Sequence, residues 1–419
     1  MNFAIQIVAA HLLGARGLGQ VALCLGVIVL GGAVTSGVVG DSLTVLDRHD
    51  TRIRGALLWW AVMLIGTTSA VAAAALHYAV GLSARDAVFF AAASVSFQTA
   101  EVMRRVFMAT LRFWYLIVVD TVALLASLAS LVVLVAERRV AVGTFLVAIA
   151  VGQTMACLAA YSLLPKHDRA LVLPRRGARR AVAAFGLWRG AQVAINPAVL
   201  TAARFLVVFA AGSAALGELE AARIFVAPAI LIVQGLGSYL LASYARDRDV
   251  PLASLVSRAT SAALGMGGAT VAAGLLLALA APTAGHLVSG PSFHVANLAV
   301  LGWGAYAASL ATLQPFASLA AARGRPRAVL AVRCADAAVS TGVLLALLLP
   351  LGLPPEAAPF ALATGPVLGG LLTRHVVLRP MLRSQRGSGH PSTPIRSTSA
   401  MPAETGYEHD RSKAVHHDL

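Results

Sequence analysis

The stretch FWYLIVVDTVALLASLASLVVLVA, residues 113–136, has a single charged side chain, Asp120, in twenty-four residues. As an α-helix rising about 1.5 Å per residue, it is long enough to cross the roughly 30 Å hydrocarbon layer of a membrane. A second such run, VAVGTFLVAIAVGQTMACLAAYSLL at 140–164, follows after three residues. Two adjacent spans of this kind predict a polytopic membrane protein built of helices.

Similar apolar runs recur along the chain, which is 58% hydrophobic and only 12% charged, with a mean hydropathy of +0.79. This composition lies far outside that of a soluble domain. The runs predict an all-α polytopic membrane protein with about twelve transmembrane helices. We expect these helices at 1–13, 18–43, 55–80, 86–104, 113–136, 140–164, 183–210, 215–244, 255–283, 294–321, 328–350 and 356–377.

The predicted helix at residues 1–13 is short for a span, because thirteen residues reach only about 20 Å. We therefore expect the working protein to begin upstream of Met1.

Basic residues alternate from side to side of the predicted membrane. The connections after the even-numbered helices hold eighteen Arg and Lys, while those after the odd-numbered helices hold only Arg16, Arg85, Arg138 and Arg139. Positive charge is retained on the cytoplasmic side, so both termini are expected there. Because the basic residues lie in short clusters between spans, the net charge of +15 is interpreted as a topology signal and no nucleic-acid partner is expected. Arg supplies nearly all of the basic charge, which suggests GC-rich coding and a bacterial cytoplasmic membrane.

The chain divides into six helices and six helices at its longest, most basic connection. We expect a six-helix lobe at 1–164, a basic cytoplasmic linker at 165–182 and a second six-helix lobe at 183–383. Residues 384–419 are rich in Ser, Pro and Gly without apolar periodicity, and they predict a disordered cytoplasmic tail.

An internal repeat accompanies this division. Shifting the chain by 198 residues aligns GARGLG at 14–19 with GSAALG at 212–217, and it also aligns Gly37 with Gly235 and Arg48 with Arg246. Because each half has an even number of helices, the repeat predicts two lobes inserted in the same orientation.

Two stretches carry a resemblance to a known family: LLGARGLGQVALCLGVIVL at 12–30 and FGLWRGAQVAINPAVLTAARFLVVFAAGSAALGELEAARIFVAPAILIVQGLGSYLLASYAR at 185–246. They resemble the polysaccharide exporter, or O-antigen-type lipid-linked oligosaccharide flippase, branch of the multidrug/oligosaccharidyl-lipid/polysaccharide flippase superfamily. The resemblance extends over residues 1–383 in topology. It implies two six-helix lobes around a central cavity and transport of a polyprenyl-pyrophosphate-linked oligosaccharide. The partners that it implies are this lipid-linked substrate, membrane lipids and polysaccharide assembly proteins.

Enzymatic motifs are missing from the sequence, which has no GxSxG, HExxH, Walker A or GxGxxG. Cys24, Cys157 and Cys334 are scattered through apolar runs, a spacing typical of neither disulfides nor zinc sites. We therefore expect a transporter without catalytic residues, metal or other cofactor.

Candidate substrate-binding residues lie mainly on the helix predicted at 183–210. At 100° per residue, Arg189, Gln192, Asn196 and Arg204 share one face, and Arg223 lies on the next helix. Charges inside a membrane usually face a cavity or a partner. Guanidinium groups suit a pyrophosphate because they offer two parallel hydrogen bonds. The alternative is that Arg189 reaches the headgroups while Arg204 and Arg223 pair with Glu218 or Glu220.

A second set of charged residues is considered for gating or coupling. Glu101, Arg104 and Arg105 could close an inner gate, or could serve topology alone. Asp120 and Asp336 could relay a coupling ion, or could neutralise the nearby arginines, which are Arg112, Arg327 and Arg333.

Three other functions stay open. A multidrug cation antiporter of the same superfamily would need intramembrane acids, but residues 1–13 have none. A major-facilitator transporter would fit Asp47-Arg48, although Gly40 lies too far from Asp47 for that family's motif. A membrane glycosyltransferase or polymerase would need a larger outward loop than the roughly ten residues available here.

Overall fold

The computed structural model describes residues 2–45, 50–110, 112–137, 140–164, 179–247, 249–289, 296–323 and 326–387, and all of the regular structure in these ranges is helical. The first half comprises α1 (Asn2–Thr35), a π-helical turn η1 (Ser36–Gly40), α2 (Asp41–Val45), α3 (Thr51–Val80), α4 (Ala84–Ala109), α5 (Phe113–Ala136) and α6 (Val142–Leu163). The second half comprises α7 (Arg179–Arg246), α8 (Leu252–Ser289), α9 (Asn297–Ala322), α10 (Pro326–Leu348), η3 (Pro355–Ala357), α11 (Ala358–Leu372), η4 (Thr373–Leu378) and α12 (Arg379–Gly387).

Two of these helices are each composed of two spans. α1 is interrupted at Gly14 and α7 at Gly212, where the backbone leaves the helical region. We divide both helices at these glycines, count η1 and α2 together with α1, and count α11, η4 and α12 as one segment. The described residues then contain twelve segments. Eight of the helices are individually long and apolar enough to cross a membrane. The predicted fold class, an all-α polytopic membrane protein with about twelve spans, is confirmed.

The two interruptions have the same geometry, as the internal repeat predicts. Gly14 has φ 66° and ψ −171°, and Gly212 has φ 84° and ψ 171°, a region that side chains other than glycine rarely enter. The segments that follow cross at two equivalent points: a Cβ on Gly19 would overlap the carbonyl of Ser213, and one on Gly217 would overlap that of Ala15. Both pairs are related by the same 198-residue shift, so these glycines let α1 and α7 touch backbone to backbone.

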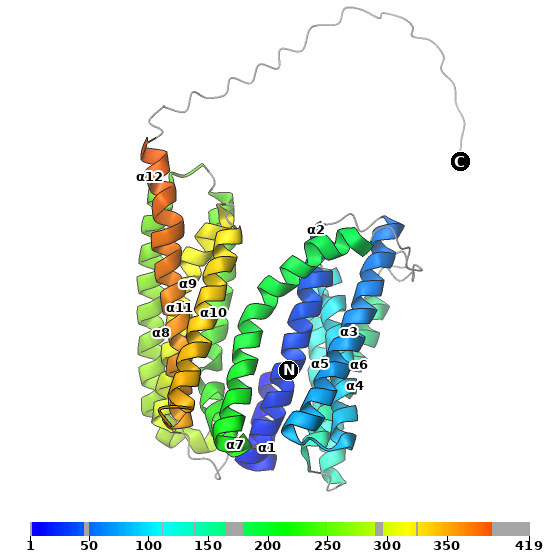
Figure 1. Ribbon diagram of the computed structural model, residues 1–419. Coiled ribbons are helices and arrows are strands. Elements are labelled where there is room, and N and C mark those ends of the chain that lie inside the picture. The colour runs from blue at the N-terminus through cyan, green and yellow to red at the C-terminus, as the bar shows by residue number, and fades with distance from the viewer. Residues whose placement is uncertain are drawn as a thin grey trace, which may run out of the picture.

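The helices form two bundles that meet at one end and separate at the other (Figure 1). At the convergent end, which holds Gly14 and Gly212, one apolar cluster joins both bundles, from Leu18 of α1 to Trp303 of α9. Toward the divergent end, which holds Asp41 and Arg246, the core divides into separate clusters. The two lobes are therefore held together mainly along α1 and α7.

Helix α7 belongs to both bundles, and it arches from one to the other (Figure 1). Near its start, Val182 is fully buried in a cluster of the first bundle, and the Trp60 indole donates to the carbonyl of Arg179 at 3.1 Å. The Arg179 guanidinium also lies 4.4 Å from the centre of the Trp59 ring. Beyond Gly212, the same helix packs mainly in the second bundle.

Several predicted boundaries are wrong. α7 begins at Arg179, inside the expected linker, and α8 reaches Ser289 rather than 283. The last helix continues through η4 and α12 to Gly387, ten residues past the expected end, because its arginines end the apolar run without breaking the helix. Residues 384–387, predicted as the start of a disordered tail, are therefore helical. Linker residues 165–178 and tail residues 388–419 lie outside the described ranges.

Candidate functional site

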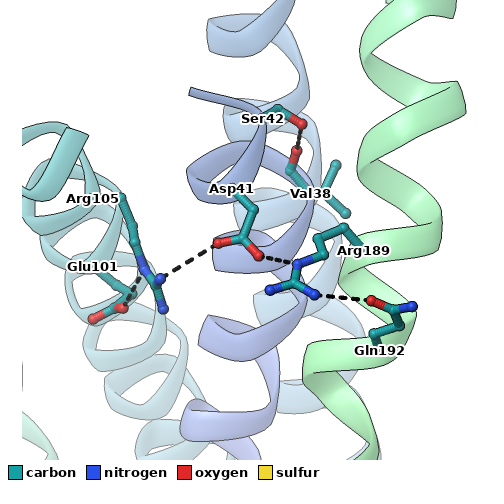
Figure 2. Close-up of polar contacts among 7 residues, drawn as sticks. All are labelled: Val38, Asp41, Ser42, Glu101, Arg105, Arg189 and Gln192. Atoms are coloured by element: carbon teal, nitrogen blue, oxygen red, sulfur yellow. Dashed lines mark hydrogen bonds and ion pairs between the residues drawn. The ribbon is translucent and has the colours of Figure 1, made fainter. Parts of the chain in front are cut away.

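A π-helical turn places an acidic side chain beside α7. η1 widens the end of α1 by one residue per turn, a distortion that often accompanies functional sites. Within η1, the Val38 carbonyl accepts from the Ser42 hydroxyl at 2.6 Å (Figure 2). Asp41 follows η1 directly, and the turn directs its carboxylate toward α7 and α4.

Small residues bring α7 close enough to meet this carboxylate. A Cβ on Gly37 would lie 2.6 Å from the Cα of Gly190, and one on Gly186 would lie 2.5 Å from the Val38 carbonyl. On the other side, a Cβ on Gly40 would lie 2.6 Å from Cγ of Arg105. Glycines at these three positions therefore admit both arginine-bearing helices, α7 and α4, to the same carboxylate.

The result is a chain of ion pairs centred on Asp41 (Figure 2). Its carboxylate pairs with the Arg189 Nε and lies 3.5 Å from the Arg105 Nη1. Arg189 also donates from Nη1 to the Gln192 side-chain oxygen at 3.0 Å. The Arg189 side chain is 47% exposed while Asp41 is 17% exposed, so the guanidinium remains accessible on one side.

The predicted gate residues extend this chain across α4 to α5. Glu101 lies 3.2 Å from Arg105 and 3.4 Å from Arg104, and Arg104 in turn lies 3.4 Å from Asp120. Asp120 thus pairs with Arg104 and not with Arg112, its predicted neighbour. With Arg189 and Asp41, the described part of the network contains three arginines and three carboxylates.

A second, more deeply buried cluster lies nearer the convergent end. The Glu220 carboxylate, only 2% exposed, accepts from Arg204 Nε at 2.8 Å and pairs through its other oxygen with Arg223. Arg223 also donates to the Gln6 side chain of α1 at 3.2 Å. The guanidinium of Arg204 lies against Gly26, where a Cβ would approach Nη1 to 2.7 Å. This cluster therefore links the two bundles.

The four polar residues predicted to share one face of α7 do not share one environment. Arg189 and Gln192 belong to the Asp41 network, whereas Arg204 packs against α1 and pairs with Glu220. The two arginines are fifteen positions apart on a helix that contains Pro197, about 22 Å along an ideal axis, so they meet different partners at different depths. Glu218, the other partner considered for these cations, makes no ion pair within the described residues.

Asn196 and Gln192 line a cavity of about 170 Å³ inside the second bundle. It also contains Asp336, whose carboxylate lies 3.6 Å from Arg333 of the same helix. The Tyr306 hydroxyl donates to the Asn196 side-chain oxygen at 3.3 Å. Among the described residues, no group of three His, Cys, Asp or Glu side chains lies close enough together to hold a metal ion.

Sequence reasoning missed Asp41, Gln6 and the cavity residues of α9. Asp41 did carry a signal, since it is an acid that follows Gly40 within an apolar run, but its partners lie 64 and 148 residues away. No local spacing could have indicated them.

Known structures share this fold. The chain matches a multidrug resistance MATE family transporter of the MOP superfamily in an inward-facing conformation with a TM-score of 0.74 and 14% identity, over 93% of this chain and 95% of that one. It matches the lipid II flippase MurJ in an inward closed conformation with a TM-score of 0.73 and 9% identity, over 93% and 90% of the two chains. A eukaryotic MATE transporter, AtDTX14, matches with a TM-score of 0.56 and 16% identity, over 92% and 94%. Comparisons with protein-family models and with the sequences of characterised proteins give no match.

Proposed function

We propose that this protein flips a polyprenyl-pyrophosphate-linked oligosaccharide across a bacterial cytoplasmic membrane by alternating access. The observation that carries the proposal is the half-exposed Arg189 guanidinium of α7, the helix that passes from one bundle to the other, held by Asp41 and Gln192. A planar guanidinium can bind a phosphate through two parallel hydrogen bonds. In this proposal the isoprenoid tail stays in the bilayer while the anionic headgroup passes between the lobes, and polysaccharide assembly proteins supply or accept the substrate.

The divergent end is assigned to the cytoplasm on charge. Arginines gather there at the ends of several helices, whereas the connections at the convergent end have only Arg16 and Arg85 among the described residues; Arg204 and Arg223 lie within helices and are paired with Glu220. In this orientation, the two bundles meet at the periplasmic end and separate toward the cytoplasmic end (Figure 1).

A reporter fused after Gly387 is expected to give a cytoplasmic signal, and one inserted after Gly81, between α3 and α4, a periplasmic one. The reason is that these positions lie at opposite ends of the bundles. Paired phosphatase and fluorescent-protein fusions measure both positions. A periplasmic signal after Gly387 would contradict the assigned orientation.

Transport in the outward direction does not require a nucleotide in this proposal. Moving an anionic headgroup out of a cell that is negative inside releases about 2.3 kcal/mol per charge per 100 mV. Two charges would gain about twice that amount, which is enough to set a direction.

A multidrug cation antiporter is the second candidate, favoured by the likeness to MATE transporters and by the buried carboxylate Asp336. Against it, the carboxylates of Asp41 and Asp336 are already paired with arginines. A bound organic cation would have to displace Arg189 or Arg333 from these pairs.

Reconstitution in liposomes separates the two candidates. We expect the purified protein to move a fluorescent polyprenyl-pyrophosphate oligosaccharide between leaflets, measured by access of a membrane-impermeant quencher, at least tenfold faster than protein-free liposomes do. The same vesicles should not accumulate ethidium when a proton or sodium gradient is imposed. Ethidium accumulation without lipid movement would establish the antiporter instead.

A further inference from the structure

The cavity inside the second bundle has features that the proposed transport of a pyrophosphate does not use. It lies among α7, α9, α10 and α11, and its volume of about 170 Å³ is below the roughly 300 Å³ of the smallest drug-sized sites. Most of its polar lining is uncharged. These uncharged polar residues are Gln192, Asn196, Gln234, Tyr306, Gln314 and Ser340.

The two opposite charges that line the cavity neutralise each other. Asp336 and Arg333 are the acid and the base that line it, and they lie 3.6 Å apart. A site for a free cation or anion would leave one of these charges without its partner. The neutral lining instead suits an uncharged ligand that can hydrogen-bond.

Some of the polar groups are already occupied within the protein. The Ser340 hydroxyl donates at 3.0 Å to the Leu362 carbonyl, which Pro366 four residues later leaves without its helical donor. The Asn196 oxygen accepts from Tyr306, and the Gln192 oxygen accepts from Arg189. These contacts fix the walls of the cavity.

Four amide groups keep hydrogen-bonding capacity for a ligand. The side chains of Gln234 and Gln314 make no hydrogen bond with another described residue, and the amide NH₂ groups of Gln192 and Asn196 are also unused. Each full amide both donates and accepts. A sugar ring presents hydroxyl groups that do the same, at several positions around a compact ring.

We infer that this cavity binds one sugar ring of the transported headgroup, a role that rests on the proposed function. The size admits a single ring and not an oligosaccharide. Gln192 contacts Arg189 and also lines the cavity, so the ring would be the sugar that adjoins the pyrophosphate. The cavity would thus select for a sugar-bearing lipid over the bare carrier.

The test compares two ligands: polyprenyl pyrophosphate, and the same lipid carrying one N-acetylglucosamine. Binding to the purified full-length protein is measured by native mass spectrometry. The double variant Gln234→Leu/Gln314→Leu should lose affinity for the sugar-bearing lipid by about tenfold and keep its affinity for the bare lipid, because only the amide contacts are removed. Gln20→Leu is the control, since Gln20 lines a different cavity in the first bundle.

Each other outcome has a distinct meaning. If the unmodified protein binds neither lipid, the proposed function fails and this inference with it. If it binds both lipids and the double variant binds both as well as before, or loses both equally, the transport function stands and the sugar site is wrong. A thermal stabilisation by sodium chloride relative to choline chloride that is lost in Asp336→Asn would also overturn the inference, because it would make the cavity a cation site.

Discussion

Replacing Glu220 by alanine is expected to lower the stability of the folded protein by about 3–5 kcal/mol. Glu220 is almost completely buried and is the shared partner of Arg204 and Arg223. Without it, two guanidinium groups would lie close together inside the membrane with no compensating charge. We expect most of the variant to be lost from the membrane fraction, and any purified remainder to unfold at a clearly lower temperature.

Glu218→Ala is the matched control, because Glu218 is two residues away and makes no ion pair within the described residues. The free energy of unfolding of this variant should stay within about 0.5 kcal/mol of the parent's, because the substitution breaks no ion pair among the described residues. Thermal unfolding in detergent measures the difference. Equal effects of the two substitutions would show that the Glu220 cluster does not hold the bundles together.

The sequence was a good guide to elements whose physics is local. The apolar run at 113–136 predicts α5 to the residue, because hydrocarbon length sets its extent. The glycines at 14 and 212 predicted equivalent breaks, since each opens a six-residue stretch and the two stretches match at their first, fifth and sixth positions. The alternative in which Arg204 and Arg223 pair with Glu218 or Glu220 was also considered from the sequence, and the partner in the structure is Glu220, three residues before Arg223 on one helix face.

Contacts between residues that are far apart in the chain could not be predicted from the sequence. The pairing of Asp41 with Arg189 depends on how η1 turns the backbone and on glycine contacts between α1 and α7. The cavity inside the second bundle brings together residues from four helices that are separate in the chain. Hydropathy also ended the last helix too early, because a helix that leaves the hydrocarbon no longer needs apolar residues.

Arg189→Ala is expected to reduce export of the lipid-linked oligosaccharide by at least tenfold while leaving protein abundance near normal. Its guanidinium is half exposed, so its removal leaves no large buried cavity, but charge-assisted bonds of about 1.5–3 kcal/mol to the substrate would be lost. Arg189→Lys should restore export only in part, because an ammonium group cannot form two parallel bonds. Arg52→Ala is the control, an exposed arginine of α3 at the same end of the molecule.

Arg204→Ala should behave in the opposite way. Arg204 is only 11% exposed and pairs with Glu220, so its loss should lower abundance first, with export per remaining molecule much less affected. Measuring abundance by immunoblot and export in the same cells separates the two arginines. If Arg189→Ala exports normally per molecule, or if Lys rescues it fully, the guanidinium does not bind substrate and the Asp41 pair serves only to join α7 to α1. A transport defect in Arg189→Ala alone would instead indicate that the divergent end binds the headgroup. A stability defect in Arg204→Ala alone would indicate that the Glu220 cluster holds the two lobes together.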